Sequence, residues 1–372
     1  MDAGPATGPA FHSIHAQILD FEHDNTPSAK ENLCRTQLTA AITAAIVRVY
    51  PTARVVLFGS SATGLALTMA DLDLVVLGVV TPCSSQPSNS QRDHILGHLR
   101  KITQLLQDAK LVKRVKVICA KVPIAKFSAP FPGIADTEVD LCIEMTNGVD
   151  AIDWVQSQVA RFVALRPMIF VLKRLLKSHQ LDDPATGGCG GYLVVSLVVA
   201  YLKSIGDEAF RSDALDVLLL GFLKYFSVDF NYARDAIAAA RAGGVMPRIQ
   251  LYPHGAPLTV VAEDPQQKGR NITGAAHRFS EVIELFRKMW LQLRATKKLS
   301  FLEGVAVRRV KKKGKKGSVH QHTVDICNRF GSAPPMRKAK RPIGVYRRGS
   351  NNDQSRESYS KQKPWKRKKK ND

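Results

Sequence analysis

The sequence predicts an α+β chain in which a domain of mixed strands and helices precedes a mostly helical one. Three observations support this. Short β-branched runs alternate with helical patterns up to about residue 150, and helical spacing dominates from there to about residue 295. The formal charge of +22 is concentrated near the carboxyl end. We therefore expect an N-terminal segment (1–30), a strand-containing domain (31–150), a helical domain (151–303) and a basic low-complexity tail (304–372).

The elements of the first domain are indicated by apolar runs that end at turn residues. A helix over Ser28–Val49 is expected to stop before Pro51, because proline cannot continue a helix. The polar stretch Pro82–Arg92 reads as an exposed loop, and a helix should follow over Asp93–Leu106. The expected strands are Arg54–Phe58, Leu72–Leu77, Val115–Lys121 and Val139–Ile143.

The second domain should consist of helices around a shared core. Its most apolar stretch, Tyr192–Leu202, is about half of the roughly 20 residues that a membrane span needs, so we interpret it as a buried helix and expect no membrane partner. The amino terminus has neither a basic region nor an apolar one, and a secretory signal is not expected. The predicted helices are Asp153–Leu165, Pro167–His179, Tyr192–Ser204, Asp213–Phe226 and His277–Leu293.

The basic charge lies mainly in the tail. Residues 304–372 hold 22 Lys/Arg against 4 Asp/Glu, a net charge of +18, which leaves +4 for the rest of the chain. Few apolar residues are available there to offset ordering entropy, so disorder is expected. The clusters KKKGKK (311–316) and KRKKK (366–370) resemble nuclear import signals, and the alternative is a tail that binds RNA. Six scattered cysteines without a CxxC pair indicate free thiols in a reducing compartment.

The chemically informative stretch is Leu57–Val76, LFGSSATGLALTMADLDLVV. It predicts a strand, a Gly-Ser turn, a short helix, and a second strand that carries Asp71 and Asp73. Residues two apart on a strand project from the same face, so these carboxylates should lie side by side. Ionised carboxylates at such a distance repel each other and favour a bound cation, for which magnesium together with substrate phosphates is well suited.

A third carboxylate and a turn complete this pattern. Asp140 follows on the expected strand EVDLCIEM, with its two neighbours facing the core, and Gly59-Ser60 can direct backbone N–H groups at a phosphate. Alone, an Asp-x-Asp pair is commonly a solvated strand end, and a Gly-Ser pair is commonly a plain turn. Their combination in this order predicts a catalytic site that uses a divalent metal ion and acts on substrate phosphates. The chain has no Walker lysine, no HExxH and no G-x-S-x-G motif.

These motifs resemble the nucleotidyltransferases of the DNA polymerase beta superfamily. Four further motifs narrow the resemblance to the noncanonical poly(A) polymerases of the TRAMP complex, a cofactor of the nuclear exosome. They are EMTNG (144–148), LRPMIFVLKRLLKSHQL (165–181), TGGCGGY (186–192) and EDPQQKGRNIT (263–273). The resemblance covers residues 11–293 and excludes the tail.

The resemblance implies a polymerase-beta-like palm with a mixed sheet, followed by a mostly helical central domain on which residues 1–30 pack. It also implies a polynucleotide adenylyltransferase that adds AMP from ATP to RNA 3′ ends with two Mg²⁺ or Mn²⁺ ions held by Asp71, Asp73 and Asp140. The implied nucleotide contacts are Gly59 and Ser60 at the triphosphate, Asn147 at the ribose, Lys173 and Lys177 at the β- and γ-phosphates, Gly191 and Tyr192 at the base, and Asp264, Arg270 and Asn271 in a base-recognition loop.

The implied setting is nuclear RNA surveillance in the nucleus or nucleolus, with a zinc-knuckle RNA-binding protein and an RNA helicase as partners. A terminal uridylyltransferase is the nearest alternative. Such enzymes carry histidine before the Asn-hydrophobic pair of the loop, where this chain has Arg270, but adenylating relatives usually carry another residue there too. A 2′-5′ oligoadenylate synthase would lack the motifs of the central domain. A catalytically weak RNA-binding scaffold would have no reason to keep three carboxylates together.

Overall fold

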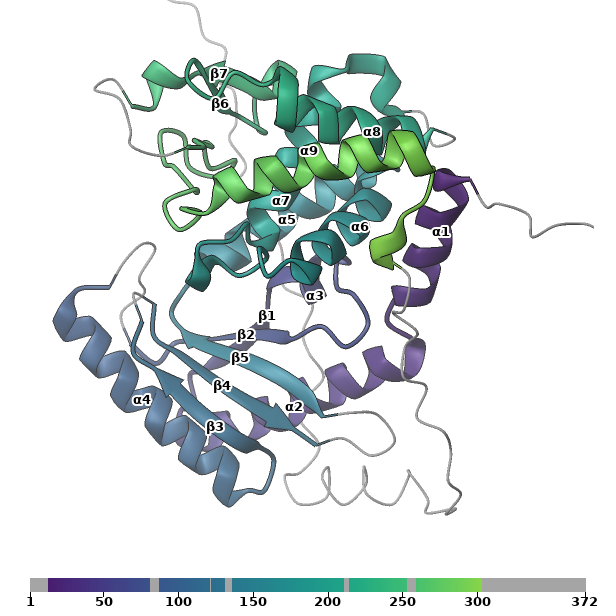
Figure 1. Cartoon of the computed structure of the whole chain (residues 1–372). Coiled ribbons are helices and arrows are strands. Elements are labelled where there is room, and N and C mark those ends of the chain that lie inside the picture. Colours follow the sequence, from purple (N-terminus) through teal and green to yellow (C-terminus); the bar gives the residue numbers. More distant parts are fainter. Residues whose placement is uncertain are drawn as a thin grey trace, which may run out of the picture. The chain divides into compact units, whose positions relative to one another are not determined.

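The structure, a computed structural model, describes residues 13–80, 87–120, 122–130, 136–210, 214–252 and 259–302. A five-stranded mixed sheet and a set of helices with a separate core make up this part of the chain (Figure 1). The predicted α+β fold class is thereby confirmed. The basic tail (304–372) lies outside the described residues, and the four-part division of the chain stays a prediction.

The strands of the sheet lie in the order β1-β2-β5-β4-β3. Strands β2 and β5 run parallel, and the other neighbours are antiparallel. The parallel pair carries two of the three predicted aspartates, Asp73 and Asp140, and Asp71 directly precedes β2. The strands are β1 (Arg54–Leu57), β2 (Leu72–Leu77), β3 (Lys113–Ile118), β4 (Ile124–Ala129) and β5 (Thr137–Ile143).

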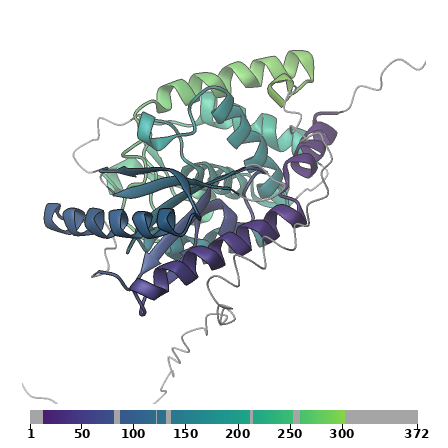
Figure 2. The same ribbon diagram turned by 90° about the horizontal axis from the view of Figure 1, so that it is seen from below.

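One face of the sheet is covered by the two long helices α2 (Ala29–Val49) and α4 (Asn89–Asp108), both prominent in Figure 2. A serine caps each helix at its start: Ser28 accepts from the backbone of Glu31, and Ser88 forms a capping box with Gln91. Alternate strand residues point into the core beneath these helices. The buried set is Leu72, Leu74 and Val76 on β2, Val139, Leu141 and Ile143 on β5, and Ala125, Phe127 and Ala129 on β4.

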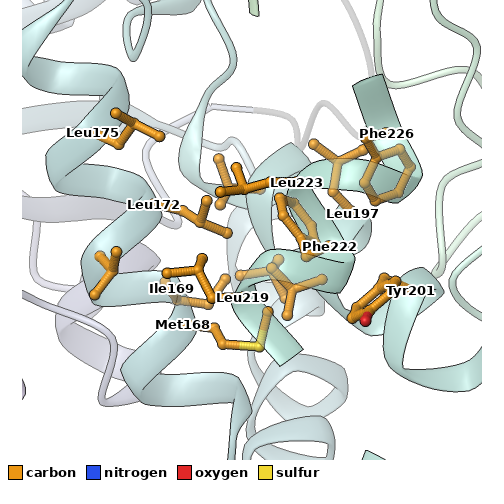
Figure 3. Packing of buried hydrophobic residues seen from close by; sticks show 14 of the residues in the cluster. Met168, Ile169, Leu172, Leu175, Leu197, Tyr201, Leu219, Phe222, Leu223 and Phe226 are labelled. Atoms are coloured by element: carbon orange, nitrogen blue, oxygen red, sulfur yellow. The ribbon is translucent and has the colours of Figure 1, made fainter. Parts of the chain in front are cut away.

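The helical part has its own core, in which leucine and phenylalanine side chains from three successive helices interdigitate (Figure 3). Leu172, Leu175 and Leu176 are buried there. Ile14 and Ile18, near the start of the described chain, lie in the same cluster. The helices are α1 (Ile14–Asn25), α5 (Asn147–Arg161), α6 (Leu165–Ser178), α7 (Gly191–Ser204), α8 (Leu215–Lys224) and α9 (Phe279–Thr296).

Several features differ from the predicted elements. Helix α4 begins at Asn89, inside the stretch expected to be a loop, and α5 begins at Asn147, six residues before the expected start. Strand β4 was not expected, and neither was the hairpin formed by β6 (Asp235–Ile237) and β7 (Val245–Pro247) in the helical part. The hairpin strands have three residues each, too few for a period-two pattern to stand out. No helix among the described residues has the length and apolar character needed to cross a membrane.

Candidate active site

Asp73 and Asp140 are direct partners in the register of the two parallel central strands. Their neighbours Leu72 and Val139 are fully buried in the core on the opposite face. Asp71 lies one residue before β2 and is exposed. The structure therefore brings the three predicted carboxylates to one side of the sheet.

The charges of these carboxylates act on one another. Burial, followed by the charges of Asp140 and Asp71, raises the pKa of Asp73 to about 6. Burial also raises the pKa of Asp140, against the opposing effect of Lys126. A partly desolvated site with excess negative charge favours a cation.

Lys126 on β4 supplies one positive charge to this site. It lies opposite Asp140 in the strand register and donates a hydrogen bond from Nζ to Asp140 Oδ2 at 2.5 Å. Burial would lower the pKa of Lys126, but this hydrogen bond and the charges of Asp140 and Asp71 raise it overall. Lys126 was not predicted from the sequence, because strand β4 was not predicted either. The alternation of buried Ala125 and Phe127 with an exposed lysine is the signal that could have found both.

The donor chemistry of the three carboxylates suits Mg²⁺ or Mn²⁺, which prefer oxygen ligands. The raised pKa values of Asp73 and Asp140 agree with this, since a divalent cation would relieve the repulsion. In the described part of the chain, however, no three His, Cys, Asp or Glu side chains form a group that could hold a metal ion. Asp140 is paired with Lys126 instead. The residues present fit a divalent ion chemically, without forming a closed ligand set.

Gly59 lies against the Asp73 carboxylate at the turn after β1. Its φ of +63° is in the left-handed region, and a Cβ built there would lie 2.9 Å from Asp73 Cγ and closer still to Oδ2. Ser60 follows within the short helix α3 (Gly59–Thr63). The hydroxyl of Ser60 makes no hydrogen bond to any described residue. Ser60 thus directly follows the glycine that packs on the Asp73 carboxylate.

Two buried residues of α2, neither of which was predicted from the sequence, hold the loop that leads into Asp71. The Arg35 guanidinium pairs with Glu31 Oε1 at 3.1 Å, and each of the two side chains is at most 9% exposed. Arg35 also donates to Ser61 Oγ at 2.9 Å and to the carbonyl of Ala70. Glu31 accepts from the Met69 backbone N–H at 2.9 Å. The pair therefore hydrogen-bonds to this loop near its start, at Ser61, and near its end, at residues 69–70.

The helical part holds the first half of the same loop. Gln156 Nε2 donates to the carbonyl of Ala62 at 2.8 Å, and Arg166 Nε donates to that of Gly64 at 3.1 Å. Lys173 Nζ donates to the carbonyl of Leu65 at 2.9 Å. These backbone contacts connect α5 and α6 to the segment that follows Ser60.

Lys173 is the better buried of the two predicted phosphate-binding lysines. Burial lowers its pKa to about 8, Asp73 opposes this change and Lys177 adds to it. Lys177, one turn further along α6, is exposed. The electrostatic effect of Asp73 on Lys173 places this lysine near the carboxylates.

Asn147 is the first residue of α5, and its Oδ1 is buried without a hydrogen-bond partner within the described ranges. The next residue, Gly148, packs on the Phe58 ring at the end of β1, where a Cβ would lie within 2.9 Å of Cε2. This close packing fixes the start of α5 beside the Gly59 turn. The start of α5 thus presents a buried acceptor that has no partner among the described residues.

Tyr192 joins the predicted recognition loop through its hydroxyl. It donates to Asp264 Oδ1 at 3.0 Å, and Asp264 Oδ2 lies 3.4 Å from Arg270 Nη1. Burial raises the pKa of Tyr192, so the phenol stays protonated. The neighbouring residue Gly191 is within van der Waals distance of the Lys173 side chain, since a Cβ there would lie 3.7 Å from Cε. These predicted contacts for base and phosphate thus lie close together.

Both polar side-chain atoms of Asn271 form hydrogen bonds to other residues of the protein. Its Oδ1 accepts from the backbone of Ala262 and Thr273 and from the Thr273 hydroxyl, at 2.8–3.2 Å. Its Nδ2 donates to Tyr252 Oη at 3.1 Å. The side chain therefore shapes the loop.

Comparison with known proteins finds a matching family model, curated relatives and solved structures of similar fold. Residues 14–154 match the family model described as "Poly(A) RNA polymerase, mitochondrial-like, central palm domain". Poly(A) RNA polymerase protein 2 of Saccharomyces cerevisiae is 28% identical over 281 residues, which are 73% of this chain and 46% of that protein. Poly(A) RNA polymerase cid14 of Schizosaccharomyces pombe is 31% identical over 237 residues, 62% of this chain and 33% of that protein. The chain thus matches less than half the length of these curated relatives.

Among solved structures, the polymerase core of TRAMP, described as an RNA surveillance complex, has a TM-score of 0.66 at 24% identity, covering 84% of this chain and 93% of that chain. A structure of the Cid1 poly(U) polymerase reaches 0.62 at 19% identity, with coverage of 76% and 92%. These likenesses show that the chain shares the fold of these two polymerases. By sequence and by fold the chain is therefore similar to the noncanonical poly(A) RNA polymerases, and the resemblance that its motifs predict is confirmed.

Proposed function

We propose that this protein is a polynucleotide adenylyltransferase that adds AMP from ATP to RNA 3′ ends without a template. The observation that carries the proposal is the register of β2 and β5, which sets Asp73 beside Asp140 while Lys173 approaches from α6. A scaffold that only binds RNA gains nothing from repelling carboxylates at a partly buried place. The names of the curated relatives, poly(A) RNA polymerases, support the same activity.

In the proposed reaction, the 3′-hydroxyl of the RNA gives its proton to water, and its oxygen attacks the α-phosphorus of ATP. A new P–O bond forms, the bond to the β-phosphate breaks, and pyrophosphate leaves with the electron pair. Lys173 and Lys177 neutralise the β- and γ-phosphates, on which negative charge develops. Ser60 holds the triphosphate, Asn147 the ribose and Tyr192 the base. Holding both reactants in line supplies much of the rate enhancement, so no covalent enzyme intermediate is needed.

Asp71, Asp73 and Asp140 are the residues that would hold Mg²⁺ or Mn²⁺, with two ions as the proposed complement. Bound there, a divalent ion supplies charge stabilisation for the phosphates and lowers the pKa of the attacking hydroxyl. The negative charge that these carboxylates concentrate on one face of the sheet supports this assignment.

Uridylyl transfer is the second candidate, and the fold similarity to the Cid1 poly(U) polymerase favours it specifically. The two functions would share every step except base selection, for which the loop with Asp264, Arg270 and Asn271 is the proposed site. We favour ATP because the curated relatives are poly(A) polymerases.

A primer-extension assay tests the proposal. Labelled RNA is incubated with each of the four NTPs and Mg²⁺ or Mn²⁺, and Asp140→Asn serves as the inactive control. We expect extension with ATP and a much lower rate with UTP. Preferential extension with UTP would replace the adenylyltransferase by the uridylyltransferase. No extension with any nucleotide by well-folded protein would contradict both.

We further propose that the protein acts in nuclear RNA surveillance, within a TRAMP-like complex that includes a zinc-knuckle RNA-binding protein and an RNA helicase. The clusters at 311–316 and 366–370 support nuclear import, and the structural similarity to the TRAMP polymerase core supports the assembly. Fluorescent fusions of the full chain and of a chain without residues 304–372 test the location. A truncated fusion that remains nuclear by its own sequence would show that the import signal lies elsewhere.

A further inference from the structure

Four charged residues lie in one row across the face of the sheet that is opposite to α2 and α4. The register pairs Asp73 with Asp140, Asp140 with Lys126, and Lys126 with Lys116. Directly opposed residues on neighbouring strands point to the same face, so the row passes from two carboxylates to two lysines at the β3 edge. Neighbouring strands are about 4.8 Å apart. The distance from one charged residue of the row to the next is therefore short compared with the length of an RNA strand of several nucleotides.

The two lysines differ in their ion pairing. Lys126 hydrogen-bonds to Asp140, although its side chain is 47% exposed. Lys116 is exposed, and no ion pair to it occurs in the described ranges. The next cation on the edge strand, Arg114, is already paired with Glu138 at 2.9 Å and with Asp136 at 3.5 Å. Lys116 is thus a cation beyond the site that has no acidic partner among the described residues.

The donor nucleotide and the RNA must reach the carboxylates from different sides. The proposed triphosphate contacts lie on the β1 side, where the Gly59 turn meets Asp73 and where Lys173 contacts the loop at Leu65. The lysine row lies on the β3 side of Asp140. An in-line attack needs the acceptor opposite the leaving pyrophosphate, and this leaves the lysine side for the RNA.

We propose that Lys126 and Lys116 form a track for the last phosphodiester groups of the RNA and so deliver its 3′ end to Asp140. The occupant is single-stranded RNA, because phosphates complement a row of lysines whose inner end meets the carboxylates. The inference rests on the proposed nucleotidyl transfer and adds the path of the acceptor to it. The order of the row makes a further distinction: Lys126 contacts the phosphate nearest the 3′ end, and Lys116 contacts one further back.

Primer length tests this order. Extension by the full-length protein is measured with a dinucleotide and with an RNA of about five nucleotides, both too short for the tail to dominate binding. With the longer primer, Lys116→Gln should raise the KM for RNA by up to roughly fivefold, the effect of losing one exposed ion pair, and leave the KM for ATP unchanged. With the dinucleotide, Lys116→Gln should have no effect, whereas Lys126→Gln should still raise the KM.

Lys101→Gln is the matched control. Lys101 is an exposed lysine of α4, the helix on the covered face of the sheet, so its loss changes the net charge equally without touching the row. It should leave the KM for RNA unchanged with both primers. An equal KM for wild type and Lys116→Gln on the longer primer, in an active enzyme, would overturn the track. A wild type that extends no primer would instead refute the proposed function itself.

Discussion

Gly59 and Asp73 are packed so closely that the glycine has no room for a side chain. A Cβ on Gly59 would overlap the Asp73 carboxylate, and the glycine also adopts a left-handed φ. The turn after β1 and the carboxylate on β2 are therefore built against each other. The Phe58 N–H, which donates to the Asp73 carbonyl at 3.1 Å, fixes the same pair of strands.

Gly59→Ala should therefore inactivate the enzyme more than it unfolds it. The methyl group would displace the Asp73 carboxylate, while the left-handed φ adds strain of about 1–3 kcal/mol. We expect at least roughly a hundredfold loss of kcat, since a 1 Å misplacement at an active site has that effect. Extension rates and urea unfolding of this variant and of Gly64→Ala are compared. Gly64 also has a positive φ but nothing within 4 Å of its Cβ position, so it reports strain alone. Equal activity of both variants would contradict the argument.

Lys173 should set the alkaline limit of ATP use. Its pKa of about 8 means that the cation needed for phosphate binding disappears as the pH rises through this value. We expect kcat/KM for ATP to fall above about pH 8, because this ratio reports groups of the free enzyme. Lys173→Arg should shift the fall to higher pH, since a guanidinium keeps its charge. An unchanged alkaline limb in the arginine variant would exclude Lys173 as its origin.

The same lowered pKa affects stability. Because the pKa is lower in the folded than in the unfolded chain, the unfolded chain binds more protons between about pH 8 and 10, the latter being near the usual lysine pKa. The contribution of Lys173 to the free energy of unfolding therefore rises with pH in this window. The free energy of unfolding is measured against pH for the wild type and for Lys173→Met. The difference between the two curves should show this rise.

Arg35 should be a positioning residue for Asp71. Arg35→Met leaves Glu31 buried without its partner, which costs about 3–5 kcal/mol of stability, and it frees the carbonyl of Ala70 directly before Asp71. We expect kcat to fall in the fraction that remains folded, with little change in the KM for ATP. Arg166→Met is the control, because Arg166 holds the same loop at Gly64, six residues earlier. A kcat loss of equal size in both variants would show that the whole loop had loosened, and it would contradict a specific role of Arg35 in positioning Asp71.

Much of the site could be predicted because its residues are close in the sequence. Gly59, Ser60, Asp71 and Asp73 share one strand-turn-strand stretch, and Asp140 stands in an alternating apolar run that reveals its strand. Lys126 could not be found without β4, since its role depends on a register between strands that the sequence does not display.

Long-range side-chain contacts were equally hidden. Glu31 and Arg35 look like an ordinary i,i+4 pair on a surface helix, and nothing local indicates that they contact residues 61–70. Asn271 was predicted as a nucleotide contact from the motif, and the structure adds that its side chain also holds the loop together.

The tail should contribute RNA affinity without affecting chemistry. Its net charge of +18 can release counterions from RNA, with a log–log salt slope of about −0.7 for each phosphate contacted. Removing residues 304–372 should raise the KM for a long RNA, flatten the salt slope between about 50 and 200 mM, and leave kcat unchanged, because the tail binds substrate and transition state equally. A lower kcat with an unchanged slope would assign the tail a role in the fold or the site.

The most direct test of the account is the activity of Asp71→Ala, Asp73→Ala and Asp140→Ala, each measured as saturating kcat for RNA extension with ATP and Mg²⁺. The account predicts a loss of at least roughly 10³-fold in each variant, because every carboxylate is needed to hold the cationic charge at the reacting phosphate. Urea unfolding and circular dichroism should show a fold unchanged from the wild type. Extension at the wild-type rate by any of the three variants would contradict the assignment of that aspartate and, for Asp73 or Asp140, the central claim.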